Sequence, residues 1–122
     1  MADILQLKEM ARQAAEKYGL SAPLVFAVIS VESGWNPDAY NPSGATGLMQ
    51  VMCKEAGFPE RPSKAELLDP ATNLDWGCRI LADCLKRAGG DVQKALCYYS
   101  GGTAWKSYDQ YLSAYWSRIN DL

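Results

Sequence analysis

The chain has 122 residues, of which 48% are hydrophobic and 21% are charged, a composition typical of a single compact domain over residues 1–122. Twelve Lys and Arg residues stand against fourteen Asp and Glu residues, so the formal net charge is −2. No run of like charge occurs along the sequence. This balance argues against a nucleic-acid partner.

The sequence contains no histidine. That absence excludes Ser-His-Asp triads, Cys-His proteases, His-ligated zinc sites and imidazole acid–base chemistry. Any catalysis must therefore use carboxylates, Tyr, Lys or Cys. The cysteines Cys53, Cys78, Cys84 and Cys97 form no Cys-x-x-Cys pair, so they give little support for a structural zinc site or a redox motif. We expect buried thiols instead.

Residues 1–10 carry a charge every few positions and have no uninterrupted apolar core, which is unlike a secretory signal. No apolar stretch reaches transmembrane length. The expectation is therefore a chain that begins in a cytoplasm, unless a leader has been removed, and that does not insert into a membrane. Thiols usually stay reduced in that compartment.

Two helices are predicted at the start of the chain. Apolar residues recur at three- and four-residue steps over 4–18, which indicates an amphipathic helix ended by Gly19. Residues 24–31 are apolar nearly all round, and Ser21 followed by Pro23 is typical of a helix start. We expect the second helix to be buried.

A loop and four further helices are predicted after that segment. Glycine, proline and asparagine are dense over 34–47, which indicates a loop. Helices are expected over 47–56, 70–88, 92–99 and 105–119, the last from the spacing of its aromatic side chains. No alternation typical of a strand persists beyond a few residues, so the predicted fold class is all-α.

Glu32 is out of place, because it directly follows the apolar segment 24–31 and precedes the break at Ser33 and Gly34. Low dielectric disfavours an ionised carboxylate, so a buried Glu at this point would be suited to donate a proton near neutral pH. An ordinary exposed Glu at a helix end is the alternative. The periodicity of the segment does not separate the two interpretations.

The chain holds four segments that bear on this choice: 32–37 (ESGWNP), 44–50 (GATGLMQ), 69–77 (DPATNLDWG) and 95–102 (ALCYYSGG). Together they resemble the lytic transglycosylases that cleave peptidoglycan, of the SLT type related to goose-type lysozyme. The segments occur in the family's order and span most of the chain. Glu-Ser-Gly alone would carry no information, whereas four ordered matches in 122 residues are a strong signal.

The resemblance implies a compact lysozyme-like helical domain with a substrate cleft, which acts as a monomer on a peptidoglycan strand without cofactor or metal. It makes Glu32 the single catalytic acid. It also implies that Tyr99 forms a hydrogen bond near the Glu32 carboxyl group. The substrate-binding residues that it suggests are Gln50, Met52, Tyr99, Asn41, Ser33, Ser100 and Tyr108. Met52 and Tyr99 could instead belong to the core, whereas a buried Gln50 amide would need partners such as a sugar acetamide.

The chain departs from the family pattern at several of these positions. Asn41 stands where relatives often have Ser, and Ser100 replaces the usual Asn of the Ala-Tyr-Asn-x-Gly element. Cys53 and Glu55 replace the Pro and Thr that commonly follow Gly-Leu-Met-Gln. The replacements at Cys53 and Glu55 affect the shape of the predicted helix more than the chemistry of the site.

The reaction implied by the resemblance is non-hydrolytic. Glu32 protonates the oxygen between N-acetylmuramic acid (MurNAc) and N-acetylglucosamine (GlcNAc), and the substrate's acetamide stabilises the positive charge. The ionised Glu32 then takes the proton of the muramic acid C6 hydroxyl, which closes a 1,6-anhydro ring.

Two other functions remain as alternatives to the transglycosylase. A lysozyme-type hydrolase needs a second acid, for which Asp38 is the nearest candidate in sequence, although a turn role after Pro37 suits that residue better. A non-catalytic glycan-binding module would keep the cleft without turnover, but the intact Glu-Ser-Gly argues against it. Trp35 and Tyr108 are the aromatic residues favoured for cleft contacts.

The substrate places the site of action at the cell wall, in the periplasm or outside the cell. A phage enzyme, a secretion-system accessory and a fragment of a larger exported protein all remain open as sources. Cys78 and Cys84 lie about 9 Å apart along a continuous helix, too far for a disulfide. A Cys53–Cys97 bridge stays open, with free thiols favoured.

Overall fold

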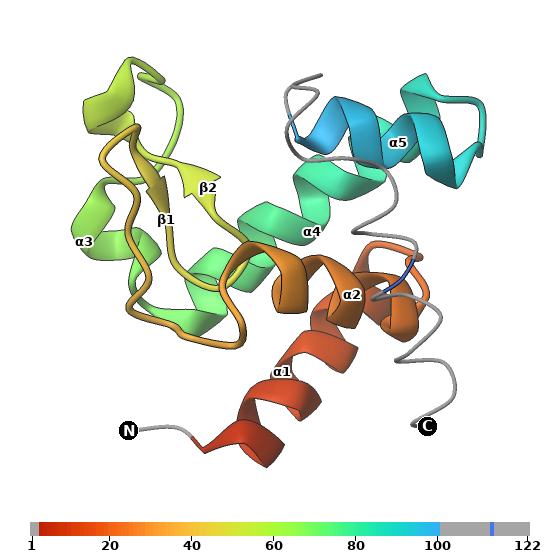
Figure 1. Cartoon of the computed structure of the whole chain (residues 1–122), viewed down its shortest axis with the longest axis horizontal. Coiled ribbons are helices and arrows are strands. Elements are labelled where there is room, and N and C mark those ends of the chain that lie inside the picture. Colours follow the sequence, from red (N-terminus) through yellow and green to blue (C-terminus); the bar gives the residue numbers. More distant parts are fainter. Residues whose placement is uncertain (1–2, 101–112, 114–122) are drawn as a thin grey trace.

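The computed structural model describes residues 3–100 and Ser113. Within this part the chain forms five α-helices, one 3₁₀ helix and one two-stranded hairpin. Their bounds are α1 (Ile4–Lys17), α2 (Ala22–Glu32), β1 (Ala45–Thr46), β2 (Val51–Met52), η1 (Lys54–Ala56), α3 (Lys64–Leu67), α4 (Pro70–Arg87) and α5 (Val92–Tyr99). Figure 1 shows α4 as the central helix, with the hairpin and α3 at one end and α5 at the other. The helix predicted over 105–119 lies outside the described residues, apart from Ser113.

The helix starts follow from capping side chains in the sequence. Ser21 caps α2 by accepting from the Leu24 N–H at 3.2 Å. Asp69 and Asp91 cap α4 and α5 in the same way. Such caps satisfy backbone donors that a helix start leaves without intrahelical partners. The predictions for these helices and for α1 are confirmed to within one or two residues.

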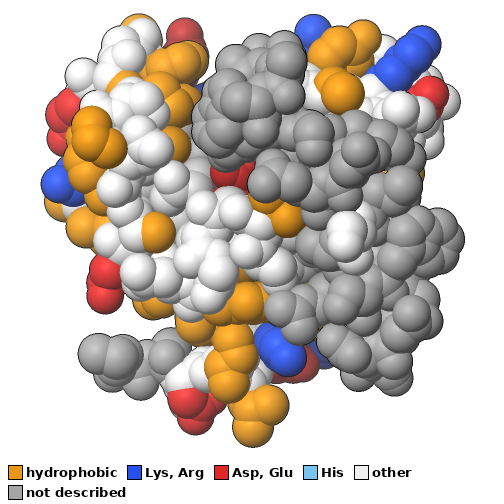
Figure 2. Space-filling model, in the orientation of Figure 1, with side chains coloured by type: hydrophobic (Ala, Val, Ile, Leu, Met, Phe, Trp, Pro, Cys, Tyr) orange, Lys and Arg blue, Asp and Glu red, His pale blue; other side chains and the backbone are white. Residues whose placement is uncertain are grey.

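The core lies between α2 and the inward faces of α1 and α4. Residues 24–29 of α2 are all buried, which confirms the prediction that this helix is enclosed. The other two helices supply Leu7, Ala11, Ala15, Leu74, Cys78 and Leu81. Helix α4 also contacts α3, α5 and β2, so it joins the hairpin to the rest of the domain. Hydrophobic side chains also reach the surface over the start of α1 (Figure 2), where Ile4 and Leu5 are exposed.

The helix predicted over 47–56 is wrong. This segment forms a turn, strand β2 and the 3₁₀ helix η1, and the strands pair antiparallel with Ala45 opposite Met52. Gly47 and Gln50 have φ angles of +75° and +52°, which a right-handed helix does not allow. The apolar residues were interpreted as a helix face, but they are buried because the turn folds against α4. The domain is thus mostly helical with one short hairpin.

The four-residue helix α3 was not predicted. Its signal is a capping box, in which the Ser63 hydroxyl accepts from the Glu66 N–H and the Glu66 carboxylate accepts from the Ser63 N–H. None of the helices in residues 3–100 is long and apolar enough to cross a membrane.

Candidate active site

The turn over residues 47–50, between β1 and β2, is the point at which three helices meet. Leu48 and Met49 are completely buried in it, and Gln50 follows them in the left-handed region. A non-glycine residue in that region is strained unless its surroundings hold it, and such residues cluster at functional sites. The Gln50 side-chain amide donates to the Gly47 and Ala39 carbonyl oxygens at 3.0 and 3.3 Å. These bonds hold both the turn and the Gln50 side chain.

Asn73 on α4 holds the turn through side-chain hydrogen bonds. Its side chain is 1% exposed and makes three hydrogen bonds. The oxygen accepts from the Met49 N–H at 2.9 Å, and the nitrogen donates to the carbonyl oxygens of Thr46 and Leu67 at 2.7 and 2.9 Å. A buried amide with this set of partners has its hydrogen-bonding capacity well satisfied. Asn73 therefore ties the hairpin to α4 and to the end of α3.

Two glycines allow the turn to come this close to α4. A Cβ atom at Gly77 would meet the Met49 side chain, with its Cβ at 2.6 Å. A Cβ atom at Gly47 would meet the Asn73 amide and would lie 2.7 Å from the Leu67 carbonyl oxygen. Both positions therefore require a residue without a side chain. The close approach buries Met49 against the middle of α4.

Ser33 brings the end of α2 to the same turn. Its hydroxyl lies 2.7 Å from the Leu48 carbonyl oxygen and 3.2 Å from the Ile29 carbonyl oxygen, in position to donate to either. Glu32, the last residue of α2, directly precedes Ser33. Glu32 is half-buried rather than enclosed. The hydrogen bond therefore places the candidate acid at the junction between the α2 end and the turn.

Tyr99 comes to the turn from α5. Its hydroxyl donates to the Met49 carbonyl oxygen at 2.6 Å, across 50 positions of sequence. The ring is half-buried and packs against the core, as one of the two interpretations of Tyr99 proposed. Its hydroxyl reaches the backbone of the turn. Met49 is thus held on its N–H side by Asn73 and on its carbonyl side by Tyr99.

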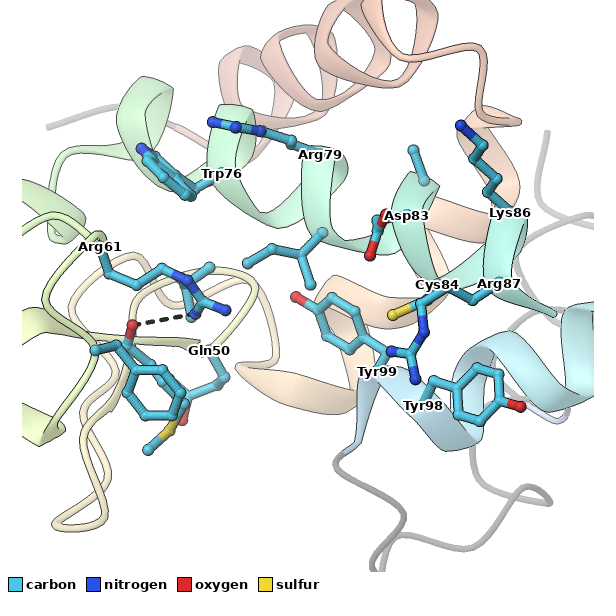
Figure 3. Close-up of a pocket in the computed structure, with 15 residues that line it drawn as sticks. Gln50, Arg61, Trp76, Arg79, Asp83, Cys84, Lys86, Arg87, Tyr98 and Tyr99 are labelled. Atoms are coloured by element: carbon cyan, nitrogen blue, oxygen red, sulfur yellow. Dashed lines mark hydrogen bonds between the residues drawn. The ribbon is translucent and has the colours of Figure 1, made fainter.

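A cavity of about 770 Å³ opens beside this turn, between β2, α4 and α5 (Figure 3). Gln50, Met52 and Tyr99 all line it, so the structure brings together three of the residues assigned to substrate binding. Figure 3 shows Gln50 and Tyr99 on opposite sides of the space, with α4 as its wall. Met52 is half-buried, and its side chain lies at the cavity rather than in the core. A cavity of this volume is suited to a small ligand or part of a polymer.

The other expected site residues are placed differently. Asn41 is exposed, and its side-chain oxygen accepts from the Ser43 N–H at 2.9 Å in the loop before β1. The Ser100 hydroxyl donates to the Cys97 carbonyl oxygen at 3.0 Å, at the end of α5. Neither of them, nor Glu32 or Ser33, is among the described residues that line the cavity. Tyr108 lies outside the described residues.

Trp35 packs against α2. Its ring meets Phe26 edge-on with 5.4 Å between the centroids, and its indole N–H donates to the Ser30 hydroxyl at 3.0 Å. Its φ angle of +67° is the second left-handed value at a non-glycine residue among the described ones. Trp35 thus supports the fold of the loop after Glu32 and does not line the cavity.

All four cysteines are free thiols. Cys53, Cys78 and Cys84 are buried and Cys97 is exposed. Burial raises the pKa of Cys78 to about 12 and also raises the pKa of Cys84. These two thiols are therefore poor nucleophiles, because the thiolate is the reactive form. Cys84 borders the cavity without offering covalent chemistry there.

Asn73 and Gly77 lie in the segment 69–77, and the family resemblance predicted no role for either of them. The signal for Asn73 was a polar residue within the apolar stripe of α4, where a buried amide needs partners. The signal for Gly77 was a glycine inside a helix, where it costs stability unless another chain segment approaches closely. The partner of both is Met49, which the sequence pattern did not identify.

The domain is mostly helical, with Glu32 at the end of its buried helix and a turn held by Asn73 and Tyr99. The family model described as the transglycosylase SLT domain matches residues 9–115, and the chain belongs to this family. It is similar to the membrane-bound lytic murein transglycosylase C of Yersinia enterocolitica, at 36% identity over 108 residues that cover 76% of this chain and 30% of that protein. The corresponding protein of Serratia proteamaculans is 37% identical over 108 residues, with the same coverage. The chain thus spans about a third of the length of these relatives.

Proposed function

We propose that this domain is a peptidoglycan lytic transglycosylase, which cleaves the MurNAc-β-1,4-GlcNAc bond without water and leaves 1,6-anhydro-MurNAc ends. Its substrate is a glycan strand of the bacterial cell wall, and it acts as a monomer in the periplasm or outside the cell. Family membership and the names of the similar proteins support the substrate class.

The observation that carries the proposal is the convergence of three helices on one turn. Ser33 ties the Glu32 end of α2 to Leu48, Asn73 ties α4 to Met49, and Tyr99 ties α5 to the same residue. Positions fixed in this way hold catalytic groups in one geometry without reorganisation during the reaction. The arrangement supports a role for Glu32 that its place in the sequence alone left open.

Glu32 is the acid in this proposal. It protonates the glycosidic oxygen, so the bond to the muramic acid anomeric carbon breaks and the GlcNAc hydroxyl leaves. The neighbouring acetamide stabilises the anomeric carbon, as in other glycosidases that use substrate assistance. Glu32 then takes the C6 hydroxyl proton, and the C6 oxygen forms the new bond to that carbon. One carboxyl group therefore serves as acid and then as base.

Gln50 and Met52 bind the sugar in this proposal. The Gln50 side-chain N–H groups are used by backbone carbonyls, and no hydrogen bond within the described residues involves its Oε1 atom. That oxygen is therefore the acceptor which Gln50 offers to an acetamide N–H or a sugar hydroxyl. Met52 supplies an adaptable apolar surface against the ring.

The test is product analysis with Glu32→Gln and Glu60→Gln, which each remove one carboxylate. Glu60 is exposed in the connection after η1, so its variant controls for the change in charge. We expect the unmodified chain and Glu60→Gln to release anhydromuropeptides from purified sacculi, detected by mass spectrometry. Glu32→Gln should retain the circular dichroism spectrum and lose cleavage. Undiminished cleavage by Glu32→Gln would remove Glu32 from the acid role.

The same experiment distinguishes a transglycosylase from a lysozyme-type hydrolase. Products with reducing ends only would identify a lysozyme-type enzyme, which requires a second acid to position water. Asp38 is exposed, and its backbone N–H donates to the Asn36 side chain at 3.0 Å in a local turn. This geometry favours the turn role of Asp38 over a role as a second catalytic group.

A further inference from the structure

The cavity beside the candidate active site is lined by an excess of positive charge. Among the described residues it is bordered by Arg61, Arg79, Lys86 and Arg87, with Asp83 as the only carboxylate. The chain as a whole has a net charge of −2. Figure 2 shows Lys and Arg side chains beside hydrophobic ones at the α4–α5 end of the molecule. Positive charge is therefore concentrated at this cavity, although the chain as a whole has a negative net charge.

Each of the three arginines lies over an aromatic ring that also lines the cavity. Arg79 lies 4.8 Å from the ring centroid of Trp76, and Arg87 lies 4.6 Å from that of Tyr98. Arg61 lies 5.1 Å from that of Phe58, and it donates to the Met52 carbonyl oxygen. A guanidinium over a ring is restrained by the cation–π contact and can still donate its in-plane N–H groups.

None of these side chains forms an ion pair within the described part of the chain. The ion pairs found there lie on α1 and between α1 and α4, and involve Arg12 and Lys17. Arg79 and Arg87 are exposed at the mouth of the cavity, so their donors are accessible. A concave site lined by one sign of charge attracts the opposite charge more strongly than a flat surface does.

We propose that this cationic cavity binds the carboxylates of the acidic stem peptide carried by the glycan strand, so that the domain prefers peptide-bearing strands over denuded ones. The proposal rests on the proposed function for the glycan but adds a second substrate element. Carboxylates suit planar guanidinium groups, which bind them through paired N–H donors. A strand without stem peptides keeps one lactyl carboxylate on each muramic acid, whereas the peptide adds further carboxylates that the four cations of the cavity can bind.

The position of the cavity supports this assignment. Gln50 and Tyr99 line it together with the arginines, so a sugar bound at Gln50 and an anion bound at Arg79 would occupy one continuous space (Figure 3). Stem peptides branch from the muramic acid, the same sugar whose bond is cleaved. The basic wall formed by α4 therefore lies within reach of a substituent on the bound strand.

The test is a binding measurement on the Glu32→Gln chain, which needs no turnover. Soluble glycan strands, free of phosphate-containing wall polymers, are prepared with their stem peptides and after amidase removal of the peptides. We expect tighter binding of the peptide-bearing strands. The additional changes Arg79→Gln and Arg87→Gln should together weaken that binding about tenfold, because each removes a solvent-exposed ion pair, which contributes less than a buried one. The preference should also fall steeply with salt.

Arg12→Gln is the matched control for Arg79→Gln and Arg87→Gln tested one at a time, because it removes one charge from an exposed position on α1. It should keep the preference for peptide-bearing strands. Equal binding of the two strands by the starting chain, or an equal loss with Arg12→Gln, would overturn the proposal. A chain that binds as expected, but whose unmodified form never cuts, would instead reject the proposed function and leave the anion site in place.

Discussion

The side-chain oxygen of Asn73 accepts a hydrogen bond from the backbone N–H of Met49 at 2.9 Å, inside the core. Through this bond a helix residue fixes the backbone of a turn 24 positions away in sequence. The side chain of Gln50 begins one residue later, at the cavity. Asn73 therefore acts on the candidate site by positioning the turn rather than by touching a ligand.

Replacing Asn73 with Ala should destabilise the domain strongly. The change leaves the Met49 N–H and the carbonyl oxygens of Thr46 and Leu67 without their Asn73 partner in the core. Each buried group left without a partner costs about 1–3 kcal/mol, so we expect a total loss of about 3 kcal/mol or more. Denaturant titration measures it. Asn36→Ala removes an exposed turn bond and should cost well under that, so equal losses would contradict the role of Asn73.

Replacing Gly77 with Ala should destabilise the protein although it improves helix propensity. In an open helix this change is favourable by about 1 kcal/mol. Here the new Cβ meets the Met49 side chain, and overpacking of a core typically costs about 1–3 kcal/mol. A double-mutant cycle with Met49→Ala tests the cause, because this change removes the Sδ and Cγ contacts and leaves the Met49 Cβ, at 2.6 Å, in contact with the new methyl group. The cost of Gly77→Ala should become smaller in that background. An unchanged cost would place the clash elsewhere.

Replacing Tyr99 with Phe should lower cleavage more than stability. The ring and its packing stay, while the bond to the Met49 carbonyl oxygen is lost. We expect a stability loss of about 1 kcal/mol. Under the proposed function, cleavage of sacculi should fall roughly tenfold or more, because small displacements of positioning groups slow a reaction strongly.

Tyr40→Phe is the control for Tyr99→Phe, since Tyr40 is exposed and its ring, rather than its hydroxyl, contacts Lys64. It should leave both stability and cleavage unchanged. Full cleavage by Tyr99→Phe would show that the hydroxyl has no part in the site.

Most of the helical frame was predictable because its signals are local. Helix starts are indicated by Ser21, Asp69 and Asp91, whose side chains cap the first turn of each helix. The apolar run of α2 correctly indicated burial on all sides. Such features depend on residues a few positions apart, which a single sequence displays directly.

The hairpin was not predictable, because non-local contacts decide its form. Leu48, Val51 and Met52 have the spacing of a helix face, yet the left-handed backbone at Gly47 and Gln50 turns the chain back instead. That backbone is held by Asn73, far along the sequence. The same limit applies to the site. Gln50, Met52 and Tyr99 were expected to share a cleft from the family resemblance, whereas the cationic wall on α4 follows only from the fold.

The thiols should divide into one reactive and three protected groups. Cys97 is exposed, whereas Cys53, Cys78 and Cys84 are at most 4% exposed. Burial also raises the pKa of Cys78 to about 12, so little thiolate forms there at pH 8. A thiol-specific chromogenic reagent should therefore label one cysteine quickly in the native protein and all four after unfolding. Cys97→Ser should remove the fast phase. A fast phase that remains would show that one of the three buried thiols opens to solvent.

The contact between α1 and α4 should contribute a stability that disappears in acid. Asp75 accepts from the Lys17 ammonium at 2.6 Å and from the Tyr18 hydroxyl at 2.9 Å. The hydrogen bond from Lys17 is the main reason that the pKa of Asp75 lies below 3.8 in the folded protein. A carboxyl group with a depressed pKa stabilises the fold above its unfolded pKa, and that contribution is lost as the pH falls through the folded pKa.

Asp75→Asn should therefore be less stable than the unmodified protein at pH 7, and the difference should shrink once the pH falls below about 4. Denaturant titrations from pH 7 to pH 3 measure this difference, with Glu60→Gln as the charge-matched control. The loss at pH 7 should be small, because the pair is partly exposed and solvent screens it. A difference that is constant over the whole range would mean that Asp75 stabilises α1 against α4 through packing rather than through its charge.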